Sequence, residues 1–347
     1  MEPRTTDQAL QQLLDEGRAR ASATAPDHAL LWESLAAATE GGKRFRPALV
    51  TAAHDALGGT CPGAAVEVGA AVELLHTAFV IHDDVIDGDD LRRGRLNVSG
   101  TFRAQALSAG AAPDDADDFG RTAGILAGDL ALAAAIRAVA TCGAPTHVVA
   151  RLLDLFDAAL HTSAAGELTD VRLSLGLEEA SLAESLSMEE QKTSAYSFTL
   201  PLQAGALLAG AAERTVARLG EAGRLLGVAF QLADDLIGVF GDPALTGKSA
   251  TSDLHTRKQT PLLAHARTTP EWERIRPYVG RHLTDAELAE VRRLFVASGS
   301  RRYVETVAES HLAAALAVVE ELGLSAELLG AVTTRRTLLP DSEEVAA

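Results

Sequence analysis

Apolar residues recur with helical spacing along almost the whole chain. The clearest case is the segment 65–87, where Val66, Ala70, Leu74 and Ala78 follow one another every four residues. Side chains spaced in this way share one face of a helix, so the pattern predicts a helix with a broad apolar face. The same spacing predicts helices over 116–141, 146–175, 182–213 and 215–240. No alternating β-branched series predicts a sheet.

Local residues predict where several of these helices begin, end or bend. Pro145 stands just ahead of one helix start, and Gly176 is a natural stop for that same helix. Pro201 is expected to kink or break the helix over 182–213, because it lacks a backbone N–H. Thr284 and Glu287 have the spacing of a capping box.

The predicted helices form a single domain, residues 1–347, without a Gly-Ser linker to divide it. Two irregular acidic or polar stretches, 110–118 and 242–260, are expected to be loops within it. The first 25 or so residues are expected to form a loosely attached helix, capped by Thr6, and residues 340–347 a frayed tail. The fold class is therefore all-α, a large helical bundle.

Composition agrees with this fold and limits the classes of molecule that we expect the protein to bind. Hydrophobic residues make up 47% of the 347 residues, enough for a large core, and aromatic residues only 4%. Acidic residues outnumber basic ones by 48 to 31, which gives a net charge of -17. Such a surface repels nucleic acid and anionic lipid, so neither is an expected partner. Anionic substrates would need local basic residues or metal ions.

The N-terminal residues 1–15 are polar and acidic, unlike a secretory signal. We therefore expect a cytoplasmic protein in which Cys61 and Cys142 are reduced thiols. Stable membrane insertion is not expected, because charged residues such as Asp129 and Arg137 interrupt the most apolar stretches.

Three carboxylates interrupt the apolar helix predicted over 65–87. Asp83, Asp84 and Asp87 are within one helical turn of one another and are preceded by apolar residues. Carboxylates this close repel one another unless a cation compensates them. Hard oxygen ligands of this kind suit Mg²⁺, which normally shares its ligand shell with water and substrate phosphates.

A second acidic pair lies far downstream, again inside an apolar helix. Asp234 and Asp235 follow Gln231, which is one turn earlier on the same face. A single Asp-Asp pair is more often a helix cap or part of a solvated face. Two pairs flanked by apolar residues favour a shared role, in which they face each other across a cavity and hold magnesium ions and a diphosphate.

Basic residues stand near the first acidic cluster. Arg92 and Arg93 follow it, and Lys43 and Arg46 lie in the upstream segment Gly-Gly-Lys-Arg-Phe-Arg-Pro, residues 41–47. Flexible glycines let a loop close on an anion, and the arginine fork matches phosphate oxygens. An ordinary solvated basic patch is the alternative for either cluster alone.

Taken in order, these motifs resemble those of the trans-isoprenyl diphosphate synthases, which include farnesyl and geranylgeranyl diphosphate synthases. Residues 41–47 are similar to the family's GGKRxRP, 83–94 to its first aspartate-rich motif, and 230–235 to its FQxxDD. Lys192-Thr193 is similar to its central Lys-Thr. The resemblance implies an isoprenoid synthase fold, a helical bundle around a deep central cavity, and a homodimer.

The resemblance also implies a role for each matching residue. The diphosphate of isopentenyl diphosphate would be bound by Lys43, Arg46, His76 and Arg93. The allylic diphosphate (dimethylallyl, geranyl or farnesyl) would be bound by Arg92, Lys192, Lys248 and Lys258, beside Thr193 and Gln231. The Mg²⁺ ligands would be Asp83, Asp87 and Asp234, supported by Asp84 and Asp235. The reaction implied is ionisation of the allylic diphosphate, condensation and proton loss.

The chain departs from the family pattern at two places. Gly238 stands where a third aspartate of the second motif is usual, and Asp242 is a candidate to compensate. His255, Thr256 and Arg257 stand where the family usually has Arg-Glu-Gly. This departure leaves Lys258 in register, and the loop that carries it is expected to close differently.

Residues about one turn before Asp83 are expected to form the floor under the growing chain. Ala78 leaves room there, while Phe79 closes it partly. We therefore predict geranylgeranyl diphosphate as the product, with farnesyl or longer diphosphates as alternatives.

Three other functions compete with this interpretation. A class I terpene cyclase would need an Asn/Ser/Glu-type second metal motif. A regulatory subunit tends to lose the first aspartate motif, which is intact here. A purely structural helical protein leaves the clustered charges unexplained.

Overall fold

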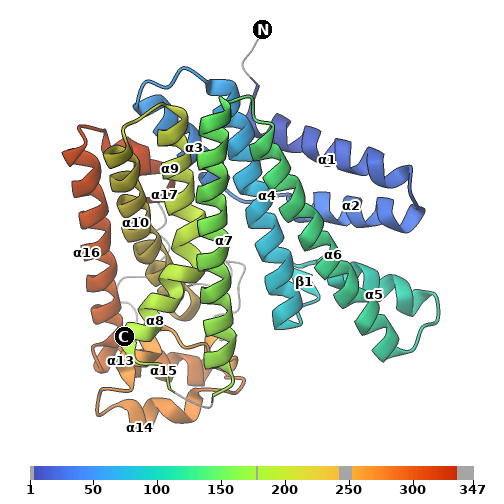
Figure 1. The fold of residues 1–347 in the computed structure, drawn as a ribbon. Helices are drawn as coiled ribbons and strands as arrows, with labels where there is room; N and C mark the ends of the chain where they lie inside the picture. Colours follow the sequence, from blue (N-terminus) through green and yellow to red (C-terminus); the bar gives the residue numbers. More distant parts are fainter. Residues whose placement is uncertain (1–3, 177–178, 242–251, 334–347) are drawn as a thin grey trace. The chain divides into compact units, whose positions relative to one another are not determined.

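The computed structural model describes residues 4–176, 179–241 and 252–333, and these are almost entirely helical (Figure 1). The all-α prediction is confirmed; the described strands are two of two residues each. The chain separates into two compact units, residues 1–156 with 203–212 and residues 157–202 with 213–347. The boundaries fall within two helices, after Phe156 and after Leu202, and ahead of a third helix that begins at Glu213.

The first unit is built around one long buried helix, α4. This helix packs against α3 on one side and α6 on another, and its Leu74 and Leu75 are fully buried. The elements of this unit, including the start of α7 and most of α9, are α1 (Thr6–Ser22), α2 (Pro26–Ala38), α3 (Phe45–Ala56), α4 (Pro62–Asp87), β1 (Leu91–Arg92), β2 (Arg95–Leu96), α5 (Val98–Ser108), α6 (Pro113–Ala140), α7 (Thr146–Ser174) and α9 (Leu200–Leu208).

Two glycines allow α6 to approach the end of α4 that carries the first aspartates. A Cβ on Gly124 would lie 2.3 Å from a methyl carbon of Val85. A Cβ on Gly128 would lie 2.2 Å from the imidazole of His82. Because His82 and Val85 flank Asp83 and Asp84, this close packing fixes the last two turns of α4.

Two predicted boundaries in the first unit are wrong. The N-cap of α1 is Thr5, whose side chain accepts from the backbone N–H of Gln8, so Thr6 is already helical. The expected loop 110–118 is shorter, because α6 begins at Pro113. Proline is favoured in the first turn of a helix, and the acidic side chains of Asp114 and Asp115 interact favourably with the helix dipole there.

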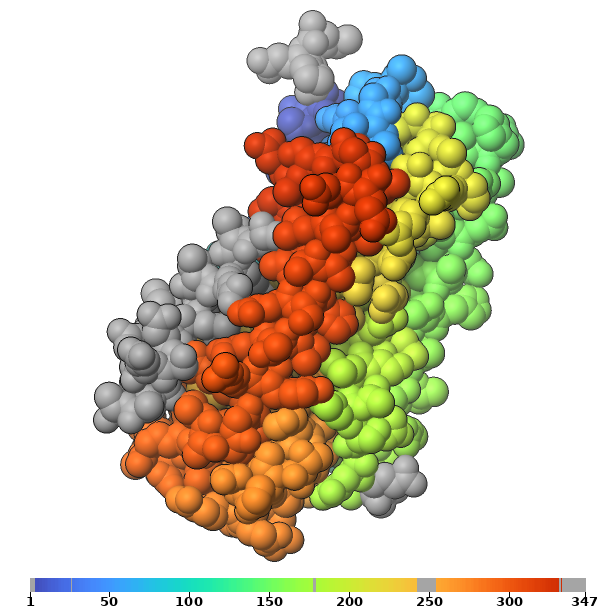
Figure 2. All heavy atoms as spheres, turned by 90° about the vertical axis from the view of Figure 1, so that its left-hand side faces the viewer, coloured from blue at the N-terminus to red at the C-terminus, as the bar shows by residue number. Residues whose placement is uncertain are grey.

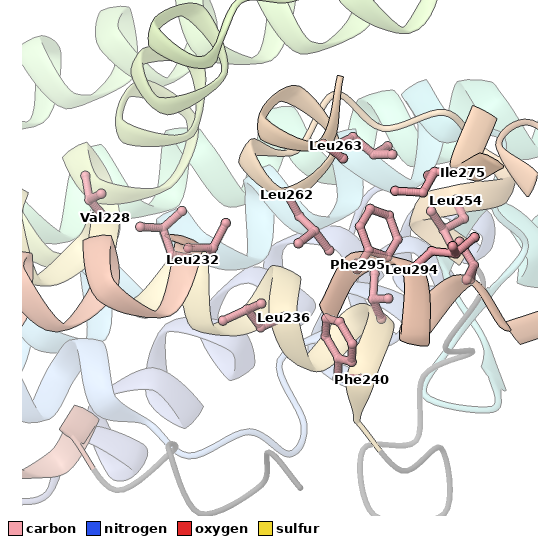
Figure 3. Close-up of a cluster of buried hydrophobic side chains, with 14 residues drawn as sticks. Val228, Leu232, Leu236, Phe240, Leu254, Leu262, Leu263, Ile275, Leu294 and Phe295 are labelled. Atoms are coloured by element: carbon pink, nitrogen blue, oxygen red, sulfur yellow. The ribbon is translucent and has the colours of Figure 1, made fainter. Parts of the chain in front are cut away.

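The second unit contains a continuous hydrophobic core around α10 (Glu213–Phe240) (Figure 3). Val228, Leu232 and Leu236 follow each other every four residues along α10 and point into this core. Its other elements, with the rest of α7, are α8 (Leu182–Glu189), η1 (Glu190–Thr199), α12 (Ser252–His255), α13 (Pro261–Ala266), α14 (Trp272–Ile275), η2 (Arg276–Tyr278), α15 (Asp285–Ala297), α16 (Ser300–Glu321), η3 (Ala326–Leu329) and α17 (Gly330–Thr333).

The C-terminal helices hold the end of α10. Figure 2 shows α16 as a long outer helix of this unit. Arg301 of α16 places its guanidinium carbon 4.7 Å from the centroid of the Phe240 ring. Arg292 of α15 donates to the carbonyl oxygens of Val239 and Gly241, at 2.7 and 3.0 Å. These contacts satisfy carbonyl groups that a helix end leaves without partners.

An uncommon π-helix, η1, connects α8 to α9. Helices of this kind are rare and often occur at functional sites. The chain does not stop at Pro201, which was expected to break or kink it, but changes from π to α geometry at Leu200. Pro201 is therefore the second residue of α9, directly after the change of helix type.

Most other local predictions are confirmed. Thr284 and Glu287 form the expected capping box, and α7 ends shortly before Gly176, whose φ is +67°. Both cysteines are free thiols. By length and composition alone α4 and α6 could cross a membrane, despite Asp129 and Arg137. Their most apolar windows are 72% and 44% buried in the protein, and buried core helices meet the same test.

Substitution of Gly205 tests the close packing of the first unit. A Cβ there would lie 2.3 Å from the carbonyl oxygen of Val50, so Gly205→Ala forces two backbones apart. We expect the free energy of unfolding to fall by about 1–3 kcal/mol in chemical denaturation. The matched control is Gly63→Ala, because nothing lies within 4 Å of a Cβ at Gly63. Equal stability of both variants would contradict this description of the packing.

Candidate active site

A network around Arg44 holds the glycine loop on α4. Gly41 and Gly42 have φ of +77° and +85°, and Arg44 itself is left-handed, with φ of +51°. The Arg44 guanidinium lies 2.5 Å from the buried Glu73 carboxylate, and it donates to the carbonyl oxygen of Thr39 at 2.7 Å. Arg44 therefore anchors the loop, while the neighbouring Lys43 remains exposed.

His76 lies within a group of arginines from the first unit. Burial lowers the pKa of His76 well below its ordinary value of 6.5, and the positive charges of Arg46, Arg93, Arg92 and Arg44 lower it further. The imidazole is therefore neutral at pH 7. Arg46 and Arg93 are close enough to His76 for their charges to lower its pKa. These three predicted residues therefore share one strongly positive region, which suits an anion.

The segment after α4 turns back as a tight hairpin. Leu91 pairs with Leu96 and Arg92 with Arg95, so Arg93 and Gly94 form a two-residue turn. Their φ angles are +54° and +74°, and positive values at both positions are what a type I′ turn requires. The Arg93 side chain donates to the carbonyl oxygen of Glu40 at 2.8 Å. The hairpin thus fixes Arg93 beside the glycine loop.

The first acidic cluster is held by Arg92. Its Nε donates to Asp84 Oδ1 at 2.6 Å, and its Nη2 donates to Asp83 Oδ2 at 3.1 Å. Burial raises the pKa of Asp84 to about 6, although the hydrogen bond and charge of Arg92 oppose this shift. Asp84 is almost fully buried, Asp83 is partly exposed, and Asp87 is exposed at the end of α4. The three carboxylates therefore differ in environment, although they share a helix end.

In the second unit, η1 and α10 are linked by side-chain hydrogen bonds. Thr193 Oγ1 donates to Gln231 Oε1 at 3.0 Å, and Gln231 Nε2 donates to Asp235 Oδ1 at 2.9 Å. The two backbones approach closely at Gly227, where an added Cβ would lie only 2.4 Å from Ser194 Oγ. Gly227, Gln231 and Asp235 are spaced by four residues, so one face of α10 makes all these contacts.

Two carboxylates of α7 surround the ammonium group of Lys192. Lys192 Nζ lies 2.7 Å from Asp170 Oδ2 and 2.9 Å from Glu167 Oε2. This arrangement brings Lys192 of η1 and two acids of a distant helix into one charged cluster.

A further acid, Glu189, lies buried beside Asp235 at the end of α8. Burial raises the pKa of Glu189 well above its ordinary value, and the Asp235 carboxylate raises it further. The positive charge of Lys258 acts in the opposite direction. The second unit thus brings together Lys192, Thr193, Gln231, Asp235 and Lys258.

Arg257 adopts a glycine-like conformation in the segment before Lys258. Its φ is +58°, which is the left-handed region that side chains rarely adopt. A Cβ on Gly280 would lie 2.2 Å from Arg257 Nε, so the Arg257 guanidinium packs against this glycine. Thr260 donates its backbone N–H to the carbonyl oxygen of Lys258 at 2.9 Å. Lys248 and Asp242 lie outside the described residues.

The carboxylates of the two aspartate motifs suit Mg²⁺, which takes only some of its ligands from protein and the others from water and phosphate. Among the described residues, no three His, Cys, Asp or Glu side chains converge as a complete protein metal site. Mg²⁺ is usually held by one or two carboxylates, with water and substrate phosphates completing the shell. Asp83 and Asp87 at the open end of α4, and Asp234 on α10, are carboxylates of this kind.

The sequence analysis missed four residues that shape these sites: Arg44, Glu167, Asp170 and Glu189. Glu167 and Asp170 stand three residues apart, which would have placed them on one helix face. Nothing in the sequence pairs them with Lys192, because the residues are more than 20 positions apart and on different helices. The bond from Arg44 to Glu73 is equally non-local.

The positive environment of His76 can be tested by removing one cation. In Arg46→Gln the protonated imidazole meets less repulsion, so we expect the pKa of His76 to rise toward its ordinary value. The measurement is a pH titration of imidazole NMR signals, with His76→Asn to assign the resonance. Arg137→Gln on the outer face of α6 is the control and should leave this pKa unchanged. An unchanged pKa in Arg46→Gln would contradict the placement of Arg46.

Comparisons with known proteins agree with this arrangement of motifs. The family model described as polyprenyl synthetase matches residues 28–295. The chain is 33% identical to (2E,6E)-farnesyl diphosphate synthase of Mycobacterium tuberculosis over 82% of this chain and 75% of that protein. It is 34% identical to geranylgeranyl diphosphate synthase of the same organism, over 84% and 79%.

Solved structures show the same fold. Geranylgeranyl pyrophosphate synthase of Corynebacterium glutamicum, determined with isoprenyl diphosphate and magnesium, superposes with a TM-score of 0.84. The two sequences are 29% identical, and the match covers 96% of this chain and 95% of that one. The family match and the M. tuberculosis relatives span most of the sequence, and on this basis the chain belongs to the polyprenyl synthetase family.

Proposed function

We propose that the chain is a Mg²⁺-dependent prenyltransferase that condenses isopentenyl diphosphate with an allylic diphosphate. The observation that carries this proposal is the cluster of Arg46, Arg93 and neutral His76, beside a helix end that bears Asp83 and Asp87. A strongly cationic site and an acidic helix end in one unit fit two diphosphates bound in different ways. One binds through cationic side chains, and the other through a metal ion.

The residues of the first unit have distinct roles in this proposal. Lys43, Arg46 and Arg93 neutralise the diphosphate of isopentenyl diphosphate, and His76 donates a neutral N–H to it. The Arg44–Glu73 pair keeps the loop in place but does not touch substrate. Arg92 bridges Asp83 and Asp84. In this proposal its remaining guanidinium donors bind the allylic diphosphate.

The residues of the second unit act on the leaving diphosphate. Lys192 and Lys258 stabilise the negative charge that develops as the carbon–oxygen bond breaks. Asp234 and Asp235, with Asp83, Asp84 and Asp87, are the proposed metal ligands. Mg²⁺, when bound, supplies Lewis acidity at the phosphate oxygens. Thr193 and Gln231 contribute hydroxyl and amide groups, and apolar helix faces exclude the water that would quench an allylic cation.

We further propose that the protein is a homodimer that pairs through α6. Three large apolar side chains of this helix are 41–49% exposed, namely Phe119, Ile125 and Leu126. The most apolar window of α6 is only 44% buried in the described structure. A second copy is the partner that the family resemblance implies, and it would remove this apolar surface from water.

The activity is tested with purified protein, Mg²⁺, isopentenyl diphosphate and each allylic diphosphate in turn. We expect an elongated prenyl diphosphate, and we expect Asp83→Ala to lower kcat by about a hundredfold or more because a metal ligand is lost. Asp157→Asn, an exposed residue on α7, is the control and should keep full activity. A cyclic hydrocarbon as product would indicate a terpene cyclase, and no turnover with any substrate would refute the proposal.

Product length is tested at Ala78, which is fully buried on α4 one turn before Asp83. We propose geranylgeranyl diphosphate as the product, since the small side chain leaves room for a long chain. Ala78→Phe should shorten the product by one or more isoprene units in a chromatographic analysis of the dephosphorylated products. Ala78→Gly adds no bulk and should not shorten it. The same product from Ala78→Phe and wild type would show that Ala78 is not part of the floor.

A further inference from the structure

The ammonium group of Lys192 lies between two acids that the proposed reaction does not otherwise use. It is 2.7 Å from Asp170 Oδ2 and 2.9 Å from Glu167 Oε2, and both acids belong to α7. At these distances each contact is a charge-assisted hydrogen bond. The contacts belong entirely to the second unit, so they depend on that unit alone.

Local backbone geometry makes this arrangement possible. Glu167 and Asp170 are three residues apart and share one face of α7. Gly166 lies beside Lys192 on the opposing helix, and a Cβ on Gly166 would be only 2.4 Å from the Lys192 backbone nitrogen. The backbones of α7 and η1 are therefore in contact, and the long lysine side chain runs alongside α7 instead of extending freely.

The two acids differ in burial. The Asp170 side chain is 10% exposed, whereas the side chains of Glu167 and Lys192 are each 24% exposed. The interior position and the shorter contact make Asp170 the firmer partner. Glu167, on the more open side of the lysine, is the partner that a diphosphate can replace more readily.

We propose that Glu167 and Asp170 are positioning residues, which act on the reaction only by holding the Lys192 ammonium in place before the allylic diphosphate binds. The inference rests on the proposed prenyl transfer, because Lys192 matters only if a diphosphate leaves beside it. A free lysine would have to lose the freedom of several rotatable bonds when substrate binds. A lysine already held in one orientation avoids that loss and meets the leaving group in a fixed geometry.

The test is a double-mutant cycle on catalysis. Asp170→Asn and Glu167→Gln keep the size of each side chain but remove its charge. In the wild-type background we expect Asp170→Asn to lower kcat/KM for the allylic diphosphate by about tenfold. Glu167→Gln should have a smaller effect, by about two- to threefold. The KM for isopentenyl diphosphate should stay within about twofold of the wild-type value in both variants.

The second arm of the cycle removes the lysine. In a Lys192→Met background, Asp170→Asn and Glu167→Gln should cause no further loss, because the group through which they act is gone. If Lys192→Met leaves too little turnover to measure, the same cycle is run on binding of an unreactive allylic thiodiphosphate by calorimetry with Mg²⁺. Asp157→Asn is the control, since Asp157 lies on the same helix and its side chain is 71% exposed.

The outcomes separate this inference from the proposed function. If the wild-type protein forms no prenyl diphosphate, the proposed function fails. If it is active but the losses in the two backgrounds add, the acids act independently of Lys192 and the inference is wrong. If Asp170→Asn in the wild-type background keeps full kcat/KM, the inference is also wrong. Circular dichroism and thermal unfolding of every variant show whether a loss comes from misfolding.

Discussion

Two carboxylates are buried within otherwise apolar helices, and the side chains around them are arranged to satisfy them. Asp84 and Asp235 are each almost fully buried, and a charged group in the interior is costly unless it is paired. Arg92, from the hairpin after α4, donates a hydrogen bond to Asp84. Gln231, one turn earlier on α10, donates a hydrogen bond to Asp235. The hairpin after α4 places Arg92 beside Asp84, and the hydrogen bond from Thr193 to Gln231 links η1 to α10 beside Asp235.

Close backbone contacts make this compensation possible. Gly128 brings α6 onto the end of α4, and Gly227 brings α10 onto the π-helix that carries Thr193. A Cβ at Gly227 would lie 2.7 Å from the Cα of Ser194, so a side chain there would meet the backbone of η1, whereas a Cβ at Gly128 would meet the His82 imidazole. The polar groups are therefore positioned by backbone packing, while the apolar faces of the same helices supply the core.

The sequence predicted most of the helices, because the helical repeat leaves a local pattern. The spacing of Val66, Ala70 and Leu74 depends only on the helical repeat. The capping box of Thr284 is also local, spanning four residues. These predictions are confirmed.

Features that depend on tertiary contacts were not predictable in the same way. The α6 start at Pro113 was missed because an acidic run was interpreted as a loop, although acids favour a helix N-terminus. The π-helix before Pro201 has no pattern of its own. The pairing of Lys192 with Glu167 and Asp170 joins helices that only the fold brings together. Roles assigned to individual residues from the family motifs remain predictions.

Under the proposed function, the acids of the two aspartate motifs bind a metal ion together with a diphosphate. Calorimetric titration of the wild-type protein with an unreactive allylic thiodiphosphate, with and without Mg²⁺, tests it most directly. We expect tight binding with Mg²⁺ and at least a tenfold loss of affinity, about 1.4 kcal/mol, when the metal is removed with chelator. Equal affinity under both conditions would contradict it.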